Sequence, residues 1–444
     1  MTPETYEKGS LSLAGTVAMG TGVMIGAGIF ALTGQVAQFS GPAFPLAFLL
    51  AAIISGFSAY TYIKMSDKYP SSGGIAMILQ KAYGPTTIAA ASALLMTMSM
   101  IINESLVART FGAYSLQLFD VAQKDTLIPV LAVGLIVLAF LVNIAGNQVI
   151  GSVSKVAAVL KIGGILFFSG ATLWASGFSF EAASTAAENV TSPAGFLAGV
   201  ALAVLAFKGF TTITNSGAEV RNPGKNVGHA IMWSLTICLV VYMSVAFAVG
   251  SSLTLEEIVA AKDFSLAEAS RPAFGDLGVG FTVIIAIIAT ASGLLASVFA
   301  VSRMLAMLTD MKLIPHRHFG MPGNIQKHML VYTVVVAATL AAFFDLGRIA
   351  SLGAIYYLVM DIIIHFGVLR HLRKSIGARA WTLVAAILFD MTALGAFIFI
   401  KAMADPAIVV IAIGSMAAIF AFEAFYLGKV RNKETPDDAG SHVQ

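Results

Sequence analysis

Four ionisable side chains interrupt long apolar stretches of this chain, where charged groups are costly and therefore informative. They are Glu104, Lys161, Lys208 and Asp361. A lysine at the centre of a membrane costs about 2.5–3.5 kcal/mol on insertion scales. Burial disfavours the ammonium form, so Lys161, in the middle of KVAAVLKIGGILFF, is a candidate for taking up and releasing a proton. Snorkelling to the interface or a fixed structural charge are the alternatives.

Two apolar stretches also carry their own interruption. The first contains Gly22, Gly26 and Gly28, each of which weakens a helix by about 1 kcal/mol relative to alanine. The second is LAFKGFT at 205–211. Both are expected to be unwound, leaving half-helix amides for a carboxylate and carbonyls for an ammonium. Close helix packing is the alternative, since Gly22 and Gly26 also form a G-x-x-x-G pattern.

These breaks give the predicted substrate-binding residues. They are Ile25, Gly26, Ala27, Gly28, Ile29, Phe207, Lys208, Gly209 and Phe210. A solute that carries one negative and one positive group close together suits such a pair of helix ends. Phe207 and Phe210 flank the second break and are expected to contact or cover the solute.

The elements that position these residues are membrane helices. Of 444 residues, 58% are hydrophobic and 11% are Asp, Glu, Lys or Arg, against about 25% charged in soluble domains. The sequence predicts an all-α integral membrane protein of about twelve helices, each long enough for a bilayer. The predicted spans are 11–37, 42–65, 85–118, 127–144, 150–175, 194–218, 227–250, 277–309, 328–344, 348–370, 381–401 and 406–428.

Loop charges predict the orientation of the chain in a cell membrane. One alternating set of loops is basic, including Lys64, Lys68, Arg221 and Arg370, whereas the opposite set is acidic or neutral. Basic loops face the cytoplasm, and an even number of spans places both termini there. The first span is too long for a signal-peptide core and is expected to be retained.

The two breaks lie five spans apart, so the second enters the membrane from the opposite side. This is the arrangement of inverted-topology repeats. The expected parts are a cytoplasmic N-terminus, two five-helix repeats, two further helices and a disordered cytoplasmic tail. Their residues are 1–10, 11–176, 194–370, 381–428 and 429–444.

Several classes of function lack support in the sequence. The single cysteine, Cys238, gives no basis for a disulfide framework or a cysteine metal site, and no metal site is expected. The H-E-x-x-H, G-x-S-x-G and phosphate-loop motifs of enzymes are absent, as is a channel filter. The modest net charge of +3 gives no reason to expect nucleic acid binding.

Three segments resemble the amino acid–polyamine–organocation superfamily. VMIGAGIF is similar to its first-helix signature, AFKGFTTITNSGAEVRNPGKNV to its sixth, and YPSSGGIAMILQKAYG to its loop between helices 2 and 3. Because of Lys161, the chain most resembles the ApcT-type proton-coupled amino acid transporters. The resemblance implies a LeuT-type fold of 5+5 inverted repeats with discontinuous helices 1 and 6. It also implies that Lys161 takes the place of a bound sodium ion, with Ser292 as its eighth-helix neighbour.

The other charges depart from this resemblance. Lys208 is expected to pair with Glu104 or Asp361, either as a structural ion pair or to shape substrate choice and carry a second proton. A fixed positive charge there disfavours cationic substrates unless Glu104 neutralises it. His365 lies one turn beyond Asp361, and the two are candidates for sharing a proton, with a hydrogen-bonded structural histidine as the alternative.

The sequence therefore predicts a secondary carrier that takes up small or broad-range amino acids with protons, by alternating access and without sodium. A proton is the only coupling ion expected, with no other cofactor. An amino acid exchanger on the same fold and an inorganic-cation carrier are the alternatives. The side-chain class of the solute and the oligomeric state stay open.

Overall fold

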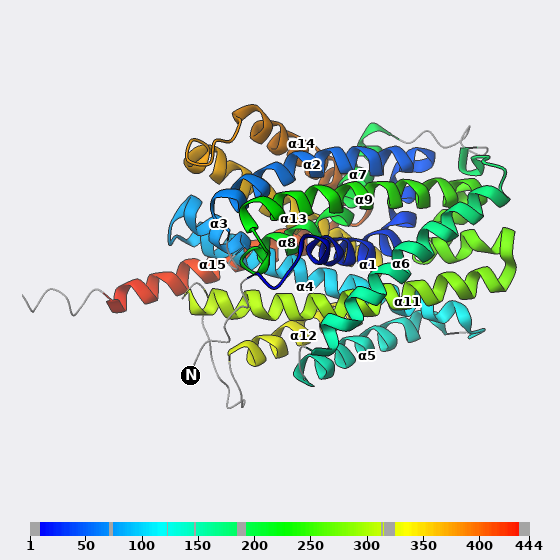
Figure 1. The fold of residues 1–444 in the computed structure, drawn as a ribbon, viewed down its shortest axis with the longest axis horizontal. Helices are drawn as coiled ribbons and strands as arrows, with labels where there is room; N and C mark the ends of the chain where they lie inside the picture. The colour runs from blue at the N-terminus through cyan, green and yellow to red at the C-terminus, as the bar shows by residue number, and fades with distance from the viewer. Residues whose placement is uncertain are drawn as a thin grey trace, which may run out of the picture.

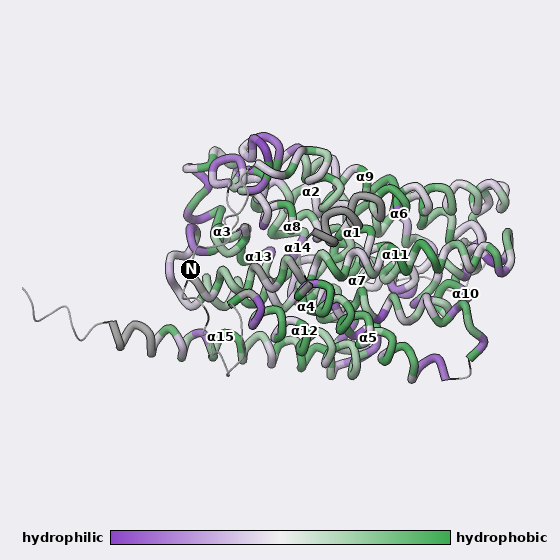
Figure 2. The backbone as a smooth tube through the Cα atoms, turned by 60° about the horizontal axis from the view of Figure 1, so that its bottom comes forward, coloured by the Kyte–Doolittle hydropathy of each residue, from purple (hydrophilic) through white to green (hydrophobic). Residues whose placement is uncertain are grey.

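The computed structural model describes residues 9–70, 74–121, 123–145, 148–183, 192–311, 314 and 325–434. Within these residues the chain is almost entirely helical, and most helices run along the long axis of the molecule (Figure 1). Hydrophobic residues dominate the helices, and hydrophilic ones gather toward the ends of the bundle (Figure 2). The protein therefore has the form of a multi-span membrane protein.

Every predicted span corresponds to a helix or to a broken pair of helices. The long helices of the first half are α1 (Leu13–Ser40), α2 (Phe44–Lys68), α4 (Thr87–Ser115), α5 (Lys124–Ala145) and α6 (Gln148–Ala175). Those of the second half are α7 (Pro193–Phe207) with α8 (Phe210–Asn215), α9 (Pro223–Ser252), α11 (Ser265–Asp310), α12 (Ile325–Phe343) and α13 (Leu346–Gly367). Two more follow, α14 (Ala380–Ala404) and α15 (Pro406–Glu434).

Ten stretches of the described residues are long and apolar enough to cross a membrane. One of them, Gly28–Lys68, joins the end of α1 to α2, while Leu13–Gly26 and Lys327–Phe343 are shorter apolar helices. Two short helices were not predicted, α3 (Gly74–Tyr83) and α10 (Leu255–Ala260). The polar tail starts later than expected, because Lys429 to Glu434 continue α15; residues 1–8 and 435–444 lie outside the described ranges.

Side chains outside the apolar runs define where several helices begin. Ser12 caps α1 by accepting from Gly15 N at 3.2 Å, and Ser192 caps α7 by accepting from Gly195 N at 3.0 Å. Asp345 caps α13 in the same way. Such caps satisfy amides that the first helical turn leaves unpaired. The helix starts therefore follow from local sequence.

The two halves pack with matching contacts. Helix α1 packs against α7, α2 against α9, α4 against α11 and α5 against α12, so each helix meets the one holding the same place in the other half. The remaining pair is α6 and α13, the fifth long helix of each half. Each packs on the third long helix of the other half, α6 on α11 and α13 on α4. This is the pairing expected of a LeuT-type multi-span fold, while the boundaries of the two repeats stay a prediction.

Candidate functional site

The sixth span is interrupted where the sequence predicts. Helix α7 ends at Phe207 and α8 begins at Phe210, with Lys208 and Gly209 in a turn between them. Thr211 N donates to Lys208 O at 3.0 Å, one residue short of the helical spacing. The carbonyl of Ala206, just before the turn, accepts from the Tyr242 hydroxyl of α9 at 3.1 Å. A backbone acceptor at the break is thus held by a side chain from a neighbouring helix.

The first span is not interrupted, which corrects the prediction of a discontinuous helix 1. Helix α1 runs from Leu13 to Ser40 through all three glycines. A Cβ atom on Gly26 would lie 3.1 Å from Ala289 O, and one on Gly28 would lie 3.0 Å from Ala206 O. The glycines therefore let α1 approach α11 and α7 closely. In apolar surroundings a helix retains its internal hydrogen bonds, and this outweighs weak local propensity.

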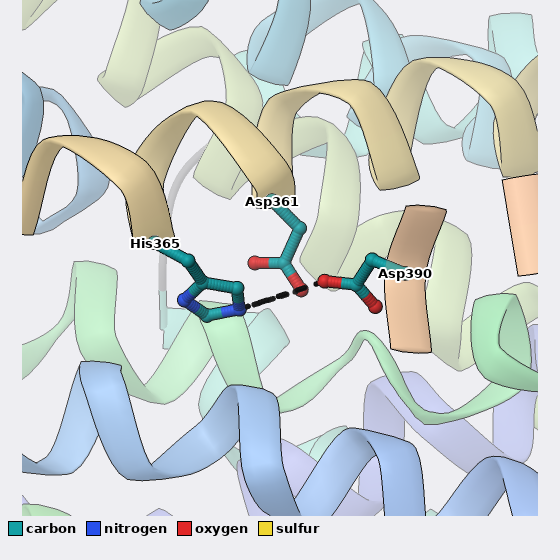
Figure 3. Close-up of side chains that lie close together, drawn as sticks. All are labelled: Asp361, His365 and Asp390. Atoms are coloured by element: carbon teal, nitrogen blue, oxygen red, sulfur yellow. Dashed lines mark ion pairs between the residues drawn. The ribbon is translucent and has the colours of Figure 1, made fainter. Parts of the chain in front are cut away.

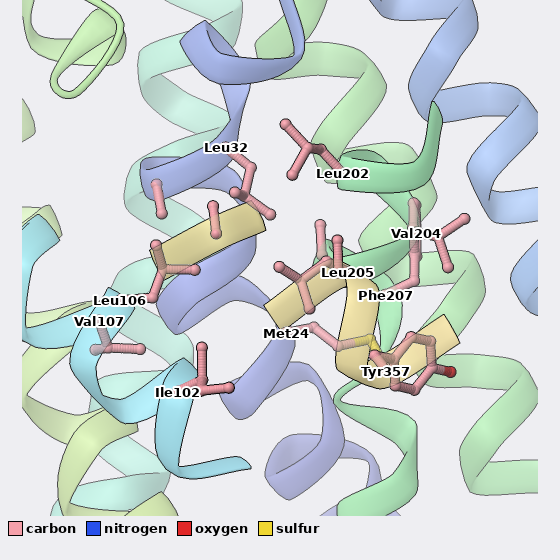
Figure 4. Packing of buried hydrophobic residues seen from close by; sticks show 14 of the residues in the cluster. Met24, Leu32, Ile102, Leu106, Val107, Leu202, Val204, Leu205, Phe207 and Tyr357 are labelled. Atoms are coloured by element: carbon pink, nitrogen blue, oxygen red, sulfur yellow. The ribbon is translucent and has the colours of Figure 1, made fainter. Parts of the chain in front are cut away.

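The two predicted binding segments nevertheless lie against each other. Gly28 faces Ala206, and a Cβ atom on Gly209 would lie 2.9 Å from Met24 N. Phe207 packs on the Tyr242 ring at 4.8 Å between centroids. Figure 4 shows Met24 of α1 and Phe207 of α7 among side chains of α4 and α13. The structure thus brings α1 and the break together, while solute binding there stays a prediction.

Most side chains of the predicted binding residues are enclosed. Ile25, Ile29, Phe207 and Phe210 are fully buried. Ala27 lies in α1, and its side chain is outside the described part of the structure. Phe207 and Phe210 thus lie buried on the two sides of the turn.

Lys161 connects α6 to α1. Its Nζ donates to Gly22 O at 2.9 Å, and the side chain is 2% exposed. The position does not allow snorkelling, because the amine points to a neighbouring backbone. Ser292 of α11 donates to Ala289 O at 3.2 Å, the same carbonyl that Gly26 approaches. Both predicted coupling residues therefore lie beside α1, Lys161 near Gly22 and Ser292 one turn away near Gly26.

Lys208 and Glu104 do not form the direct pair that the sequence suggests. Lys208 Nζ donates to Ser99 O at 2.9 Å and to Ser99 Oγ at 3.2 Å. Glu104 accepts from Ser297 Oγ of α11 at 3.3 Å, and its Oε2 has no hydrogen-bond partner among the described residues. The Lys208 amine thus contacts α4 about one turn on the N-terminal side of Glu104. Its acceptors there are the backbone carbonyl and the hydroxyl of Ser99. The expected ion pair with Glu104 or Asp361 is therefore wrong.

Asp361 instead belongs to a second cluster with His365. The two are joined by an ion pair of 3.4 Å between His365 Nε2 and Asp361 Oδ2, and a further acid, Asp390 of α14, lies 3.7 Å from the same nitrogen (Figure 3). Asp390 was missed by the sequence analysis. Its signal was available, since it is an acid within the apolar run AAILFDMTALG of the eleventh span.

The arrangement defines a class of protein before any comparison is made. It is a multi-span membrane protein with an interrupted sixth helix packed on a glycine-rich first helix, and with buried charges at both sides of that contact. The chain belongs to the amino acid permease family, whose family model matches residues 11–421. This is a family of membrane transporters rather than enzymes.

Three relatives illustrate the range of the family. The chain is 28% identical to the "Inner membrane transport protein YbaT" of Escherichia coli K12 over 390 residues, 88% of this chain and 90% of the relative. It is 28% identical to the "Branched-chain amino acid permease BcaP" of Lactococcus lactis, over 52% of this chain and 53% of the relative. It is 26% identical to the "Cationic amino acid transporter 9, chloroplastic" of Arabidopsis thaliana, over 64% and 51%.

Proposed function

We propose that this amino acid transporter takes up small or broad-range amino acids together with protons, independently of sodium. The family supports amino acid transport. The observation that carries proton coupling is the bond from Lys161 Nζ to Gly22 O at 2.9 Å. It joins a buried, titratable amine on α6 to the helix that forms one side of the predicted substrate site.

Protonation of Lys161 changes the strength of this connection. A charged ammonium makes a hydrogen bond about twice as strong as a neutral donor does. Loss of the proton therefore loosens α1 from α6, while gain of the proton tightens it. In our proposal Lys161 is protonated from outside in the loaded, outward-facing state and releases its proton toward the cytoplasm after the substrate leaves.

The moving part is expected to comprise α1, α2, α7 with α8, and α9. These helices contact one another extensively, as α1 does with α7 and α9, and as α2 does with α9 and α7. Rocking of this group against α4, α5, α11 and α12 would open the contact between Gly26 of α1 and Ala289 of α11 to one side of the membrane and then the other. The solute would bind at the amides and carbonyls beside the turn at Lys208 and Gly209.

The side-chain class of the solute is proposed from Lys208 rather than from the relatives. The relatives' names point in different directions, to branched-chain substrates for one and to cationic substrates for another. Lys208 lies in the break, satisfied by Ser99 and without an ion-pair partner among the described residues. A like charge at this place disfavours cationic side chains, so we propose uncharged amino acids as substrates.

We also propose that the chain lies in the cell membrane with both termini in the cytoplasm. The support is the basic character of one set of loops. Leu11, at the start of α1, pairs with Glu219 and Arg221 through backbone bonds of 2.9 Å. This pairing ties the entry of the first span to the exit of the sixth, and it acts as the hinge or latch of the moving group.

The test is uptake of labelled amino acids into proteoliposomes in sodium-free buffer, driven only by an imposed pH gradient. The unmodified protein is expected to concentrate an uncharged amino acid when the outside is acidic. Lys161→Ala is expected to lose accumulation and to retain substrate binding. Lys225→Ala changes an exposed lysine in the first turn of α9, so it is the matched control and should behave like the unmodified protein.

Two outcomes contradict the proposal. Accumulation by Lys161→Ala under a proton gradient alone would remove Lys161 from coupling. Transport that requires amino acid on the opposite side, with no response to the pH gradient, would identify an exchanger. Rubidium flux in the same vesicles checks the inorganic-cation alternative.

A further inference from the structure

A fully buried acid–histidine–acid cluster lies away from the contact between α1 and the sixth-span break. Asp361 and His365 come from α13 and Asp390 from α14, and all three side chains have no exposure. His365 Nε2 lies 3.4 Å from Asp361 Oδ2 and 3.7 Å from Asp390 Oδ2 (Figure 3). The mechanism proposed above uses none of these groups.

Helix α2 supplies further polar partners of the cluster, beside the Tyr357 hydroxyl of α13. Ser58 Oγ donates to Asp361 Oδ2 at 2.6 Å, and the Tyr62 hydroxyl donates to Asp361 Oδ1 at 2.5 Å. Thr61 Oγ1 lies 2.8 Å from His365 Nδ1. Asp361 therefore has two hydroxyl donors, one on each oxygen, and both come from a helix of the proposed moving group.

Asp390 has no comparable support. Neither of its carboxylate oxygens has a hydrogen-bond partner among the described residues, and the ring nitrogen of His365 that faces it lies beyond hydrogen-bond distance. A buried carboxylate without donors is strongly unfavourable, whereas a protonated carboxyl is neutral and brings its own donor. With both acids ionised, the cluster contains too few hydrogen-bond donors for its buried oxygens. Every oxygen can be satisfied only if one acid carries a proton and is therefore neutral.

Among the described residues, no charged group outside the cluster faces the two acids. The titratable groups facing the cluster are the phenols of Tyr62 on α2 and Tyr357 on α13, in addition to the three members themselves. From α8, the Phe210 ring packs against Tyr62 at 5.3 Å between centroids. Tyr62 thus touches both Asp361 and the aromatic residue that follows the break in the sixth span.

We propose that Asp361, His365 and Asp390 form a proton-binding site whose occupancy depends on the position of α2. With α2 in place, Ser58 and Tyr62 stabilise the Asp361 carboxylate, and one proton on Asp390 suffices beside the imidazole. When α2 moves away, Asp361 loses both donors and takes a proton from water. The exchanged species is a proton alone, and no covalent bond between heavy atoms changes.

A proton fits this cluster better than a metal ion does. The ligand atoms of the three residues lie within 4.8 Å of one another, a spacing that a cation would also accept. However, both oxygens of Asp361 already accept short hydroxyl bonds, which leaves few lone pairs for coordination. The unsatisfied atoms of the cluster are both carboxylate oxygens of Asp390 and Nε2 of His365, and a proton shared among them supplies the missing donor.

The movement of α2 rests on the proposed transport cycle, but proton binding is measurable without transport. The experiment is infrared spectroscopy of the substrate-free protein in nanodiscs across a pH series, observing the carbonyl stretch of protonated carboxyl groups. The unmodified protein is expected to show a buried carboxyl band that disappears as pH rises. Asp390→Asn should remove the part of the band that belongs to the cluster, while the contribution of Glu104, another buried carboxyl with an oxygen unpartnered among the described residues, should stay.

Two milder variants keep the proposal testable if Asp390→Asn does not fold. Tyr62→Phe and Ser58→Ala each remove one donor from Asp361, so the cluster should retain its proton to a pH higher by about one unit. Tyr83→Phe is the matched control, because its hydroxyl donates at 2.6 Å to Ile363 O of the same helix α13 but outside the cluster. It should leave the band unchanged.

Three results would overturn the proposal. The first is a carboxyl band of unchanged intensity in Asp390→Asn, and the second is a band that titrates identically in Tyr62→Phe and in the unmodified protein. The third is saturable binding of zinc chloride that His365→Gln abolishes, which would assign a metal site instead. The two proposals can fail separately. If the infrared band behaves as expected but proteoliposomes show no proton-driven uptake, the proposed transport mechanism is rejected and the proton-binding site is retained.

Discussion

Two regions hold the proposed moving helices to one another and to the rest of the molecule, and they do so with different chemistry. Helix α1 meets α7 and α11 backbone to backbone, at Gly28 against Ala206 and Gly26 against Ala289. Helix α2 meets α13 through side chains, with Ser58 and Tyr62 on Asp361. The first contact depends on shape, whereas the second depends on which groups carry protons.

Buried charge is satisfied differently in the two regions as well. Lys161 and Lys208 both donate to backbone carbonyls, those of Gly22 and Ser99. Of the two acids, Asp361 accepts from hydroxyl side chains of α2, whereas Asp390 has no hydrogen-bond partner in the part of the chain that the structure describes. Backbone acceptors stay in place whatever the pH, so the lysine itself is the only variable part of its contact. The acid cluster has several variable parts, and its hydrogen bonds can redistribute.

The largest expected effect comes from filling the backbone contact. Gly28→Leu places a side chain where even a Cβ atom would lie 3.0 Å from Ala206 O, an atom that cannot rotate away. Overpacking costs about 1–3 kcal/mol or more, so little folded protein is expected in size-exclusion chromatography. Gly134→Leu, at a glycine of α5 with open space around it, is the control. Equal yields of the two variants would contradict the close contact.

Removing the charge at the break should change which solutes are accepted. Lys208→Met retains the length of the side chain and removes the like charge that faces a cationic substrate. Uptake of lysine or arginine relative to alanine is expected to rise about tenfold, which corresponds to about 1.4 kcal/mol. Competition assays in proteoliposomes measure this ranking. If the ranking stays the same, Lys208 acts only through its bonds to Ser99.

Two tyrosine variants compare the regions directly. Tyr62→Phe removes a bond to a carboxylate, and Tyr242→Phe removes a bond to the Ala206 carbonyl. Hydrogen bonds to charged groups contribute about 1.5–3 kcal/mol and neutral ones about 0.5–1.5 kcal/mol. Thermal unfolding at neutral pH should therefore show the greater loss for Tyr62→Phe. The reverse order would mean that Asp361 is uncharged in this conformation.

The smallest effect is expected beyond the membrane, at the far end of α1. Gln35 Nε2 donates to Asp263 Oδ1 at 2.6 Å in the connection between α10 and α11, and burial raises the pKa of the Asp263 carboxyl. A raised pKa in the folded state means that the folded protein binds more protons than the unfolded chain. Stability is therefore lost as pH rises from the ordinary carboxyl range through that higher pKa.

Asp263→Asn removes this dependence while keeping an oxygen acceptor for Gln35. Melting temperatures measured across the acidic range should fall with rising pH more steeply for the unmodified protein than for the variant. Parallel curves would show that Asp263 ionises as freely in the folded chain as in the unfolded one.

The sequence by itself determined the number and the places of the long helices, and the ends of most of them, although α11 begins at Ser265, well before the predicted span 277–309. Apolar runs of sufficient length leave no alternative in a bilayer, and caps such as Ser12 and Ser192 act within a few residues. It also located the turn at Lys208 and Gly209, and it singled out Lys161 as a buried amine. These features depend on local composition and spacing.

Only the tertiary structure decided what the buried groups touch. Local propensity predicted a break at Gly26 and Gly28, but close neighbours on α7 and α11 make those glycines a packing surface for a continuous helix. Lys208 donates a hydrogen bond to Ser99 rather than forming an ion pair with Glu104. Asp361 lies in a cluster with His365 and Asp390 and accepts from the hydroxyls of α2. Such partners are hundreds of residues apart in some cases, and their pairing depends on which helices lie side by side.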